Sequence, residues 1–109
     1  MNVTVSKAPK IVDAIDRLNY PEGSNATITC TIASGELESL NFEWFRGDSQ
    51  RINTNPRDLR FKISTWPDNF QSILRIFNLK KDDEGYYTCQ AKNRFGIDKL
   101  VTKLSVKGK

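Results

Sequence analysis

The chain has 109 residues, 38% of them hydrophobic, and a formal net charge of +4 from 17 basic and 13 acidic side chains. This length predicts a single domain with one thin core. No apolar run approaches the roughly 18 residues of a membrane span, and the charges are interleaved as on a soluble surface. We therefore expect neither a bilayer helix nor a nucleic-acid site. No secretory leader is recognisable, so Met1 is interpreted as a start residue placed before a domain of a longer protein.

Short alternating runs between turn signals predict strands along the whole chain. Pro9 interrupts the first run, and the second run is expected to continue on the other sheet. One domain is expected over 8–107, after a flexible segment at 1–7 and before a tail or linker at 108–109. A single helical turn is expected within 80–85. The strands are expected over residues 8–12, 15–19, 25–33, 40–46, 51–53, 59–64, 71–77, 86–93 and 97–107.

Alternation along these strands separates the inward side chains from the outward ones. Over 25–33, apolar residues alternate with threonines, which suit the exposed side of a pleated strand. The inward side chains are expected to form one core. They are Ala26, Ile28, Cys30, Ile32, Phe42, Trp44, Phe61, Ile63, Leu74, Ile76, Tyr87, Cys89, Ala91, Thr102, Leu104 and Val106, with Leu79 closing one end.

A small set of residues is more specific than the alternation. Trp44 follows Cys30, and Cys89 closes residues 83–89, which read D-x-G-x-Y-x-C. This combination resembles the immunoglobulin superfamily over about residues 9–107. The resemblance implies an all-β Greek-key sandwich of two antiparallel sheets, ordered A-B-E-D and A′-G-F-C-C′ in the family's strand lettering. It also implies one inter-sheet disulfide between Cys30 and Cys89, with Trp44 packed against it.

The same resemblance implies structural roles near the second cysteine. Tyr87 matches the tyrosine corner, whose hydroxyl bonds to backbone upstream of it. Asp83 matches the acidic partner of an arginine at the start of strand D, which is Arg60 here, and such a bidentate pair locks one end of the sandwich. Losing one partner would leave an unpaired charge. Gly85 allows a tight turn into the next strand.

Two sequons, Asn2-Val3-Thr4 and Asn25-Ala26-Thr27, mark Asn2 and Asn25 as candidate N-glycosylation sites. Together with the implied disulfide, they favour the oxidising, extracellular side of the membrane. An intracellular, muscle-type module with reduced cysteines is the alternative. Free-thiol titration separates the two cases.

Residue types that carry chemistry are scarce. Without histidine, the chain lacks the commonest general base and the commonest metal ligand. Both cysteines are committed to the implied bridge. Asp82, Asp83 and Glu84 form an acidic cluster, but they lack the alternating spacing of a calcium loop. No enzymatic activity, cofactor or metal is expected.

A module without chemistry recognises partners through side chains that alternation leaves outside. On the A-B-E-D sheet, Ile73 and Phe77 are outward apolar residues. Aromatic side chains are frequent interface anchors, and so Trp66 in the D–E turn joins them as a candidate. We therefore predict a partner-binding face that contains Thr27, Thr29, Lys62, Ser64, Trp66, Ile73, Arg75 and Phe77. Further candidates are Phe45 and Val101 on the other sheet, among Glu43, Gln90 and Lys103, and Phe95 in the F–G turn.

The resemblance extends to a subclass of the superfamily. The short C′ region is typical of intermediate-set domains, and residues 8–11, 32–36, 72–76 and 87–93 resemble arthropod Down syndrome cell adhesion molecule (Dscam) domains. That family pairs homophilically through matching domains, several of them by the A-B-E-D face. The resemblance therefore implies an extracellular, self-pairing adhesion module of a membrane-anchored or secreted multidomain protein.

Two other families share parts of the pattern. Residues 40–45 are similar to the neuregulin immunoglobulin domain, and residues 56–61 are similar to the Ror receptor kinases. A heterophilic ligand or receptor module, or one that binds heparan sulfate through the basic charge, is therefore the alternative.

Overall fold

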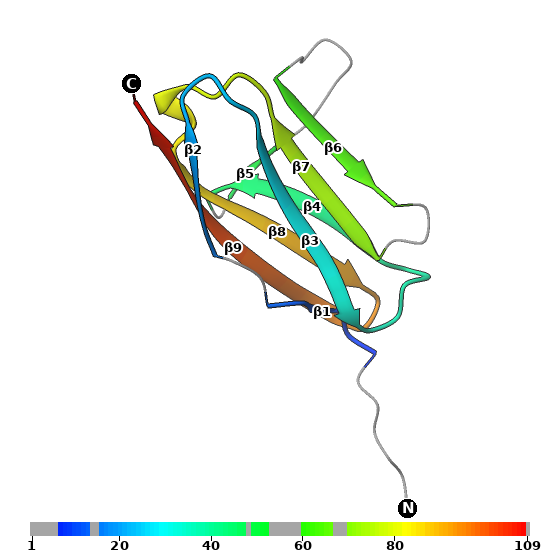
Figure 1. Ribbon diagram of the computed structural model, residues 1–109. Coiled ribbons are helices and arrows are strands. Elements are labelled where there is room, and N and C mark those ends of the chain that lie inside the picture. Colours follow the sequence, from blue (N-terminus) through cyan, green and yellow to red (C-terminus); the bar gives the residue numbers. More distant parts are fainter. Residues whose placement is uncertain (1–6, 14–15, 48, 53–59, 67–69, 109) are drawn as a thin grey trace, which may run out of the picture.

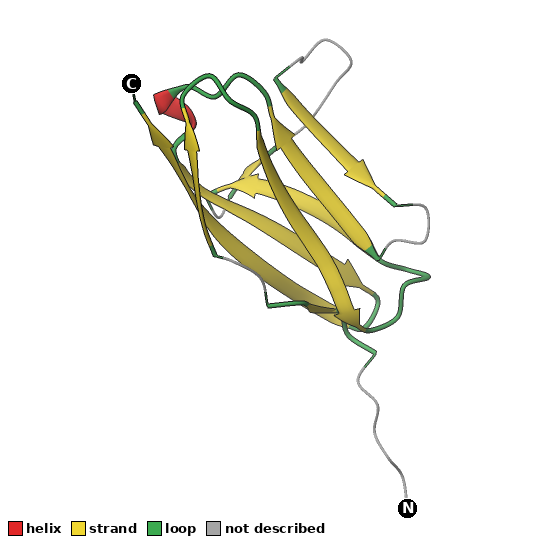
Figure 2. Cartoon of the chain, in the orientation of Figure 1, coloured by secondary structure: helices red, strands yellow, loops and turns green. Residues whose placement is uncertain are grey.

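The computed structural model describes residues 7–13, 16–47, 49–52, 60–66 and 70–108. Over these residues the chain forms two β-sheets packed face to face, with one short helical turn (Figures 1 and 2). The elements are β1 (Lys10–Ile11), β2 (Arg17–Pro21), β3 (Ala26–Ser34), β4 (Asn41–Arg46), β5 (Gln50–Arg51), β6 (Phe61–Thr65), β7 (Gln71–Ile76), the 3-10 helix η1 (Lys81–Asp83), β8 (Gly85–Asn93) and β9 (Gly96–Lys107).

The order of strands in the two sheets is that of the predicted sandwich. One sheet has the order β1-β3-β7-β6 and the other β2-β9-β8-β4-β5. In the family lettering these are A-B-E-D and A′-G-F-C-C′, so the predicted all-β fold is confirmed. Figure 1 shows the two layers, with β3 crossing in front of β8 and β9.

The expectation of two purely antiparallel sheets is wrong at one edge. β2 pairs in parallel with β9, from Arg17 beside Lys103 to Pro21 beside Lys107. The first strand is split between the sheets, and β2 continues in the direction of β1. It therefore lies alongside the last strand with the same polarity (Figure 1).

Several strands are shorter than alternation predicted. β1 has two residues instead of the five over 8–12, because Pro9 has no N–H to donate and the register shifts at Lys10. β7 ends at Ile76, so Phe77 lies just beyond it. Of the expected strand 51–53, residue 51 is in β5, and residue 53 lies outside the described part of the chain. The predicted helical turn is η1.

The core is filled by the inward residues of both sheets, as the alternation predicted. The Cys30–Cys89 disulfide joins β3 to β8 and thereby one sheet to the other. Four predicted core residues are only half-buried and pack against its margin, namely Ile32, Phe42, Phe61 and Ile63. The fully buried apolar set also includes Ile11 and Leu40, which alternation did not single out.

Candidate functional site

Trp44 bridges the two sheets beside the disulfide. Its side chain is 1% exposed, and its indole N–H donates to Ser72 Oγ on the facing sheet at 2.9 Å. Ser72 Oγ also lies 3.1 Å from Thr65 Oγ1 on β6. The partner Ser72 was missed at the sequence level, although its place in β7 between two outward residues marks it as inward. A buried hydroxyl that pairs with an indole is part of the scaffold.

A second buried network closes one end of the core. Tyr87 donates its hydroxyl hydrogen to the carbonyl oxygen of Asp83 at 2.6 Å, and burial raises the pKa of the Tyr87 phenol above its ordinary value. The Asp83 carboxylate contacts the guanidinium of Arg60 and accepts the N–H of Lys80 at 2.8 Å. These contacts hold η1 against the start of β6. The residues assigned to the tyrosine corner and the ion pair are therefore in contact.

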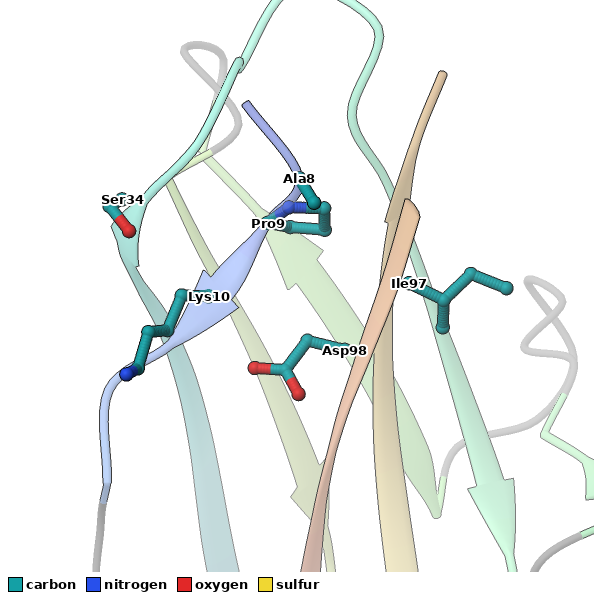
Figure 3. A pocket seen from close by; sticks show the side chains of 6 residues that line it. All are labelled: Ala8, Pro9, Lys10, Ser34, Ile97 and Asp98. Carbon is teal, nitrogen blue, oxygen red and sulfur yellow. The ribbon is translucent and has the colours of Figure 1, made fainter. Parts of the chain in front are cut away.

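A shallow groove of about 290 Å³ lies between β1 and β9 (Figure 3). In it, Asp98 points from β9 toward β1, whereas Ile97 points to the other side of the strand. Both Asp98 oxygens are engaged, because one accepts the N–H of Ile11 at 2.8 Å and the other that of Lys99 at 3.0 Å. The carboxylate therefore fastens the edge strand.

Within the described residues, no group of three acidic, histidine or cysteine side chains is placed to hold a metal ion. In the acidic cluster, Glu84 accepts the backbone N–H of Val106 at 3.0 Å and the ammonium of Lys81 at 3.2 Å. These contacts, the first above all, hold the pKa of Glu84 below its ordinary value.

The outer face of β1-β3-β7-β6, hereafter the ABED face, brings most of the predicted partner-binding residues together. Two adjacent cross-strand rows contain them: Thr29, Ile73 and Ser64 in one row, and Thr27, Arg75 and Lys62 in the other. The threonines and the two cations are exposed, while Ile73 and Ser64 are half-buried.

Trp66 and Phe77 lie at opposite ends of the ABED face. Trp66 follows β6, and its side chain is 40% exposed. Its backbone N–H donates to the carbonyl oxygen of Gln71 at 3.0 Å. Phe77 follows β7, is half-buried, and donates its N–H to Arg60 O at 2.7 Å. The two predicted aromatic anchors are thus not neighbours.

The two sequon asparagines differ in what the structure shows of them. Asn25 is exposed immediately before β3, and its Oδ1 accepts the N–H of Asn78 at 3.0 Å. In the β3 alternation it lies on the same side as Thr27, so a glycan there would stand at one end of the ABED face. Asn2 lies outside the described residues.

The outer face of β2-β9-β8-β4-β5, hereafter the GFC face, has exposed large hydrophobic side chains on its strands, whereas the described strand residues of the ABED face have none. Tyr86 is 54% exposed, Ile97 52% and Val101 48%. Val101 was predicted, but Tyr86 and Ile97 were missed, although alternation from Cys89 and Leu104 places both outside. Phe45, the other predicted residue, is half-buried.

The B–C and F–G loops are fastened to each other at one end of the sandwich. Arg94 donates to Glu36 Oε2 from Nη2 at 2.8 Å and from Nε at 3.1 Å. The Arg94 guanidinium also holds the pKa of Glu36 below its ordinary value. Phe95 is 48% exposed, and the Lys7 ammonium and the Arg94 guanidinium lie 5.5 and 5.4 Å from its ring centre. Its ring is therefore partly engaged in cation–π contacts.

Comparison with known protein families identifies the family that has this geometry. The family model described as "Immunoglobulin domain" matches residues 18–102. The chain belongs to the immunoglobulin domain family. Its buried tryptophan, tyrosine corner and inter-sheet disulfide are the features expected of this family.

Similar sequences occur in several larger proteins. This immunoglobulin domain is 34% identical to part of V-set and immunoglobulin domain-containing protein 10 of Xenopus laevis, covering 77% of this chain and 16% of that protein. It is 27% identical to part of Brother of CDO of Homo sapiens, covering 94% and 8%. It is also 27% identical to part of limbic system-associated membrane protein of Gallus gallus, covering 89% and 26%. The chain thus spans about a quarter or less of each of these relatives.

Solved structures agree on the fold of this immunoglobulin domain. A chimeric titin Z1Z2 structure superposes with a TM-score of 0.80 at 24% identity, covering 97% of this chain and all of that one. Titin domains Z1Z2 in complex with telethonin give a TM-score of 0.79 at 26% identity, covering 97% of this chain and 51% of that one. The similar proteins thus include cell-surface proteins and titin, which is intracellular.

Proposed function

We propose that this immunoglobulin domain is the extracellular recognition module of a cell-surface protein, and that it pairs with a second copy of itself through the ABED face. Relatives that are cell-surface proteins, such as Brother of CDO and limbic system-associated membrane protein, support the recognition role. The sequence resemblance to Dscam-type intermediate-set domains supports the homophilic mode. No enzymatic step is proposed.

The observation that carries the proposal is the pair of cross-strand rows on the ABED face. Ile73 is at the centre of one row, between Thr29 and Ser64, and supplies apolar surface among small hydroxyl side chains. Small side chains allow two sheets to approach closely, and a two-fold axis through the face would bring each row against its counterpart. The proposed dimer places Ile73 of one copy against the corresponding row of the other.

The charges on the ABED face oppose self-pairing at low salt. Lys62 and Arg75 are directly opposite each other on neighbouring strands, and no carboxylate projects from the described strand residues of this face. In a two-fold dimer, four cations would approach one another. Salt screens this repulsion, so the proposed dimer should strengthen as the salt concentration rises.

Analytical ultracentrifugation tests the pairing. Wild type should associate at high micromolar concentration, more strongly at 0.5 M than at about 0.05 M NaCl, because the Debye length shortens several-fold over this range. Ile73→Asp should abolish association. Val101→Asp, which adds the same charge at an exposed site on the GFC face, should leave association intact. If wild type stays monomeric throughout, or both variants behave alike, the proposal is wrong.

The extracellular assignment has its own test. Protein secreted from a eukaryotic host should contain no titratable thiol, and peptide-N-glycosidase should lower its mass if Asn25 carries a glycan. Finding free thiols in protein from an oxidising compartment would instead favour a titin-like intracellular module.

A further inference from the structure

The excess positive charge of the chain is concentrated on the GFC face. The strand residues of this face project six exposed basic side chains: Arg17, Arg51, Lys92, Lys99, Lys103 and Lys107. They project one carboxylate, Glu43, whose Oε2 lies 4.0 Å from Arg51 Nε. Six cations against one anion leave an excess of five, which is larger than the net charge of +4 of the whole chain.

These cations lie along a line. Lys99, Lys103 and Lys107 occupy every fourth position of β9, so adjacent members are about 13 Å apart along the strand. Arg17 is beside Lys103 on β2, and Lys92 is beside Ile97 on β8. The stripe therefore runs the length of β9, with five cations on β2, β8 and β9. The Glu84 carboxylate approaches it at one end, where Lys103 helps to lower the pKa of Glu84, but that carboxylate is already bonded to the Val106 N–H and to Lys81.

Exposed apolar side chains lie within the stripe. Tyr86 is beside Lys103 in the β8–β9 register, and Val101 lies one row further along β9. Both are about half exposed. An aromatic ring next to a lysine can stack on a sugar ring while the ammonium pairs with an acidic substituent on the same unit.

We propose that the GFC face binds a linear sulfated polysaccharide of the glycosaminoglycan class along β9. A chain with regularly repeating anionic groups matches a line of cations at regular intervals, whereas an acidic globular protein would match a compact patch. A second copy of this chain is more strongly disfavoured on this face than on the ABED face, because the five cations of each stripe would repel those of the other, against two from each copy there. This site is distinct from the ABED face and does not depend on self-pairing.

Heparin is the probe for this proposal. Lys99→Gln/Lys103→Gln should weaken heparin binding about thirtyfold, as expected for the loss of two lysines from an anionic surface. It should also reduce the slope of log affinity against log salt by about two, because binding through two fewer ionic contacts releases fewer counterions. The matched control is Lys62→Gln/Arg75→Gln, which removes the same charge from the ABED face and should bind heparin like wild type.

Several outcomes would overturn the proposal. Equal losses in the two double variants would show that only net charge matters. Equal affinity for polyglutamate and heparin at 0.15 M NaCl would assign the face to acidic proteins instead. Undiminished binding by the Lys99→Gln/Lys103→Gln variant would place the polysaccharide elsewhere. Because heparin binding should weaken with salt and self-pairing should strengthen, failure of one proposal is distinguishable from failure of the other.

Discussion

The indole N–H of Trp44 on one sheet is hydrogen-bonded to the hydroxyl of Ser72 on the other, at 2.9 Å in the core. Both side chains are almost completely buried. This polar contact adds to the close packing that orients the indole beside the disulfide.

Ser72→Ala should destabilise the domain by about 1–3 kcal/mol, because it leaves the buried indole donor without a partner. Urea denaturation followed by tryptophan fluorescence measures this change. Ser64→Ala, on the exposed side of the same sheet, is the control and should alter the free energy of unfolding by less than about 0.5 kcal/mol. Equal effects of the two substitutions would show that the hydrogen bond between Trp44 and Ser72 does not stabilise the domain.

Tyr87→Phe should also destabilise the domain, by about 1–3 kcal/mol, since the buried carbonyl of Asp83 loses its donor. The pKa of Tyr87 is raised in the folded state, so the folded chain holds this proton more tightly than the unfolded chain. The contribution of the protonated phenol to the free energy of unfolding is complete below the pKa of the unfolded chain, near 10. It is lost as the pH rises through the higher pKa of the folded chain. The urea midpoint should therefore fall less steeply above pH 10 in Tyr87→Phe than in wild type.

Glu84 gives the opposite dependence on pH. The pKa of Glu84 is lowered by the Val106 N–H and by Lys81. The ionised carboxylate therefore stabilises the fold at pH values above its pKa in the unfolded chain, about 4.3. This stabilisation is lost as the pH falls through the lower pKa of the folded chain. Glu84→Gln should reduce the loss of stability between pH 5 and pH 3, measured by thermal melts. Glu38→Gln, at an exposed loop residue, should leave that loss unchanged.

Reduction of the disulfide should lower the stability by about 4 kcal/mol in the chain-entropy model, given the sequence separation of 59 residues. That is a large part of the 5–15 kcal/mol typical of a domain. The Cys30→Ala/Cys89→Ala variant should therefore melt well below wild type in calorimetry. A melting temperature that does not change would show that the apolar core alone holds the two sheets together.

Much of this fold could be predicted from the sequence because side chains in a strand alternate with a period of two. The parity of Cys30, Trp44, Leu74 and Cys89 was enough to assign inside and outside. The parallel β2–β9 pair could not be predicted in this way, because alternation describes faces of a strand and contains nothing about its neighbour's direction.

The binding surfaces were predicted less well than the core. Alternation identified Ile73 as outward, but neighbouring side chains cover part of it, so that it is half-buried. The packing of those neighbours cannot be derived from the sequence of one strand. Tyr86 was missed because it lies within the D-x-G-x-Y-x-C motif, whose inward residues have structural roles. Ile97 lies outside that motif and was missed although alternation along β9 places it outward. The basic stripe depends on the register between β2, β8 and β9, so it becomes visible only when these strands are placed side by side.

The parallel pairing of β2 with β9 also has a mechanical consequence. The N-terminal strand β1 and the end of β9 lie at opposite ends of the sandwich (Figure 1). Tension applied between the two ends of the chain therefore loads the β2–β9 hydrogen bonds in shear, so that they resist together and do not open one by one. If the β2–β9 bonds break, the disulfide still prevents the segment between Cys30 and Cys89 from extending. That sequence separation of 59 residues corresponds to roughly 200 Å of contour length. Under load, this module would lengthen only at its ends.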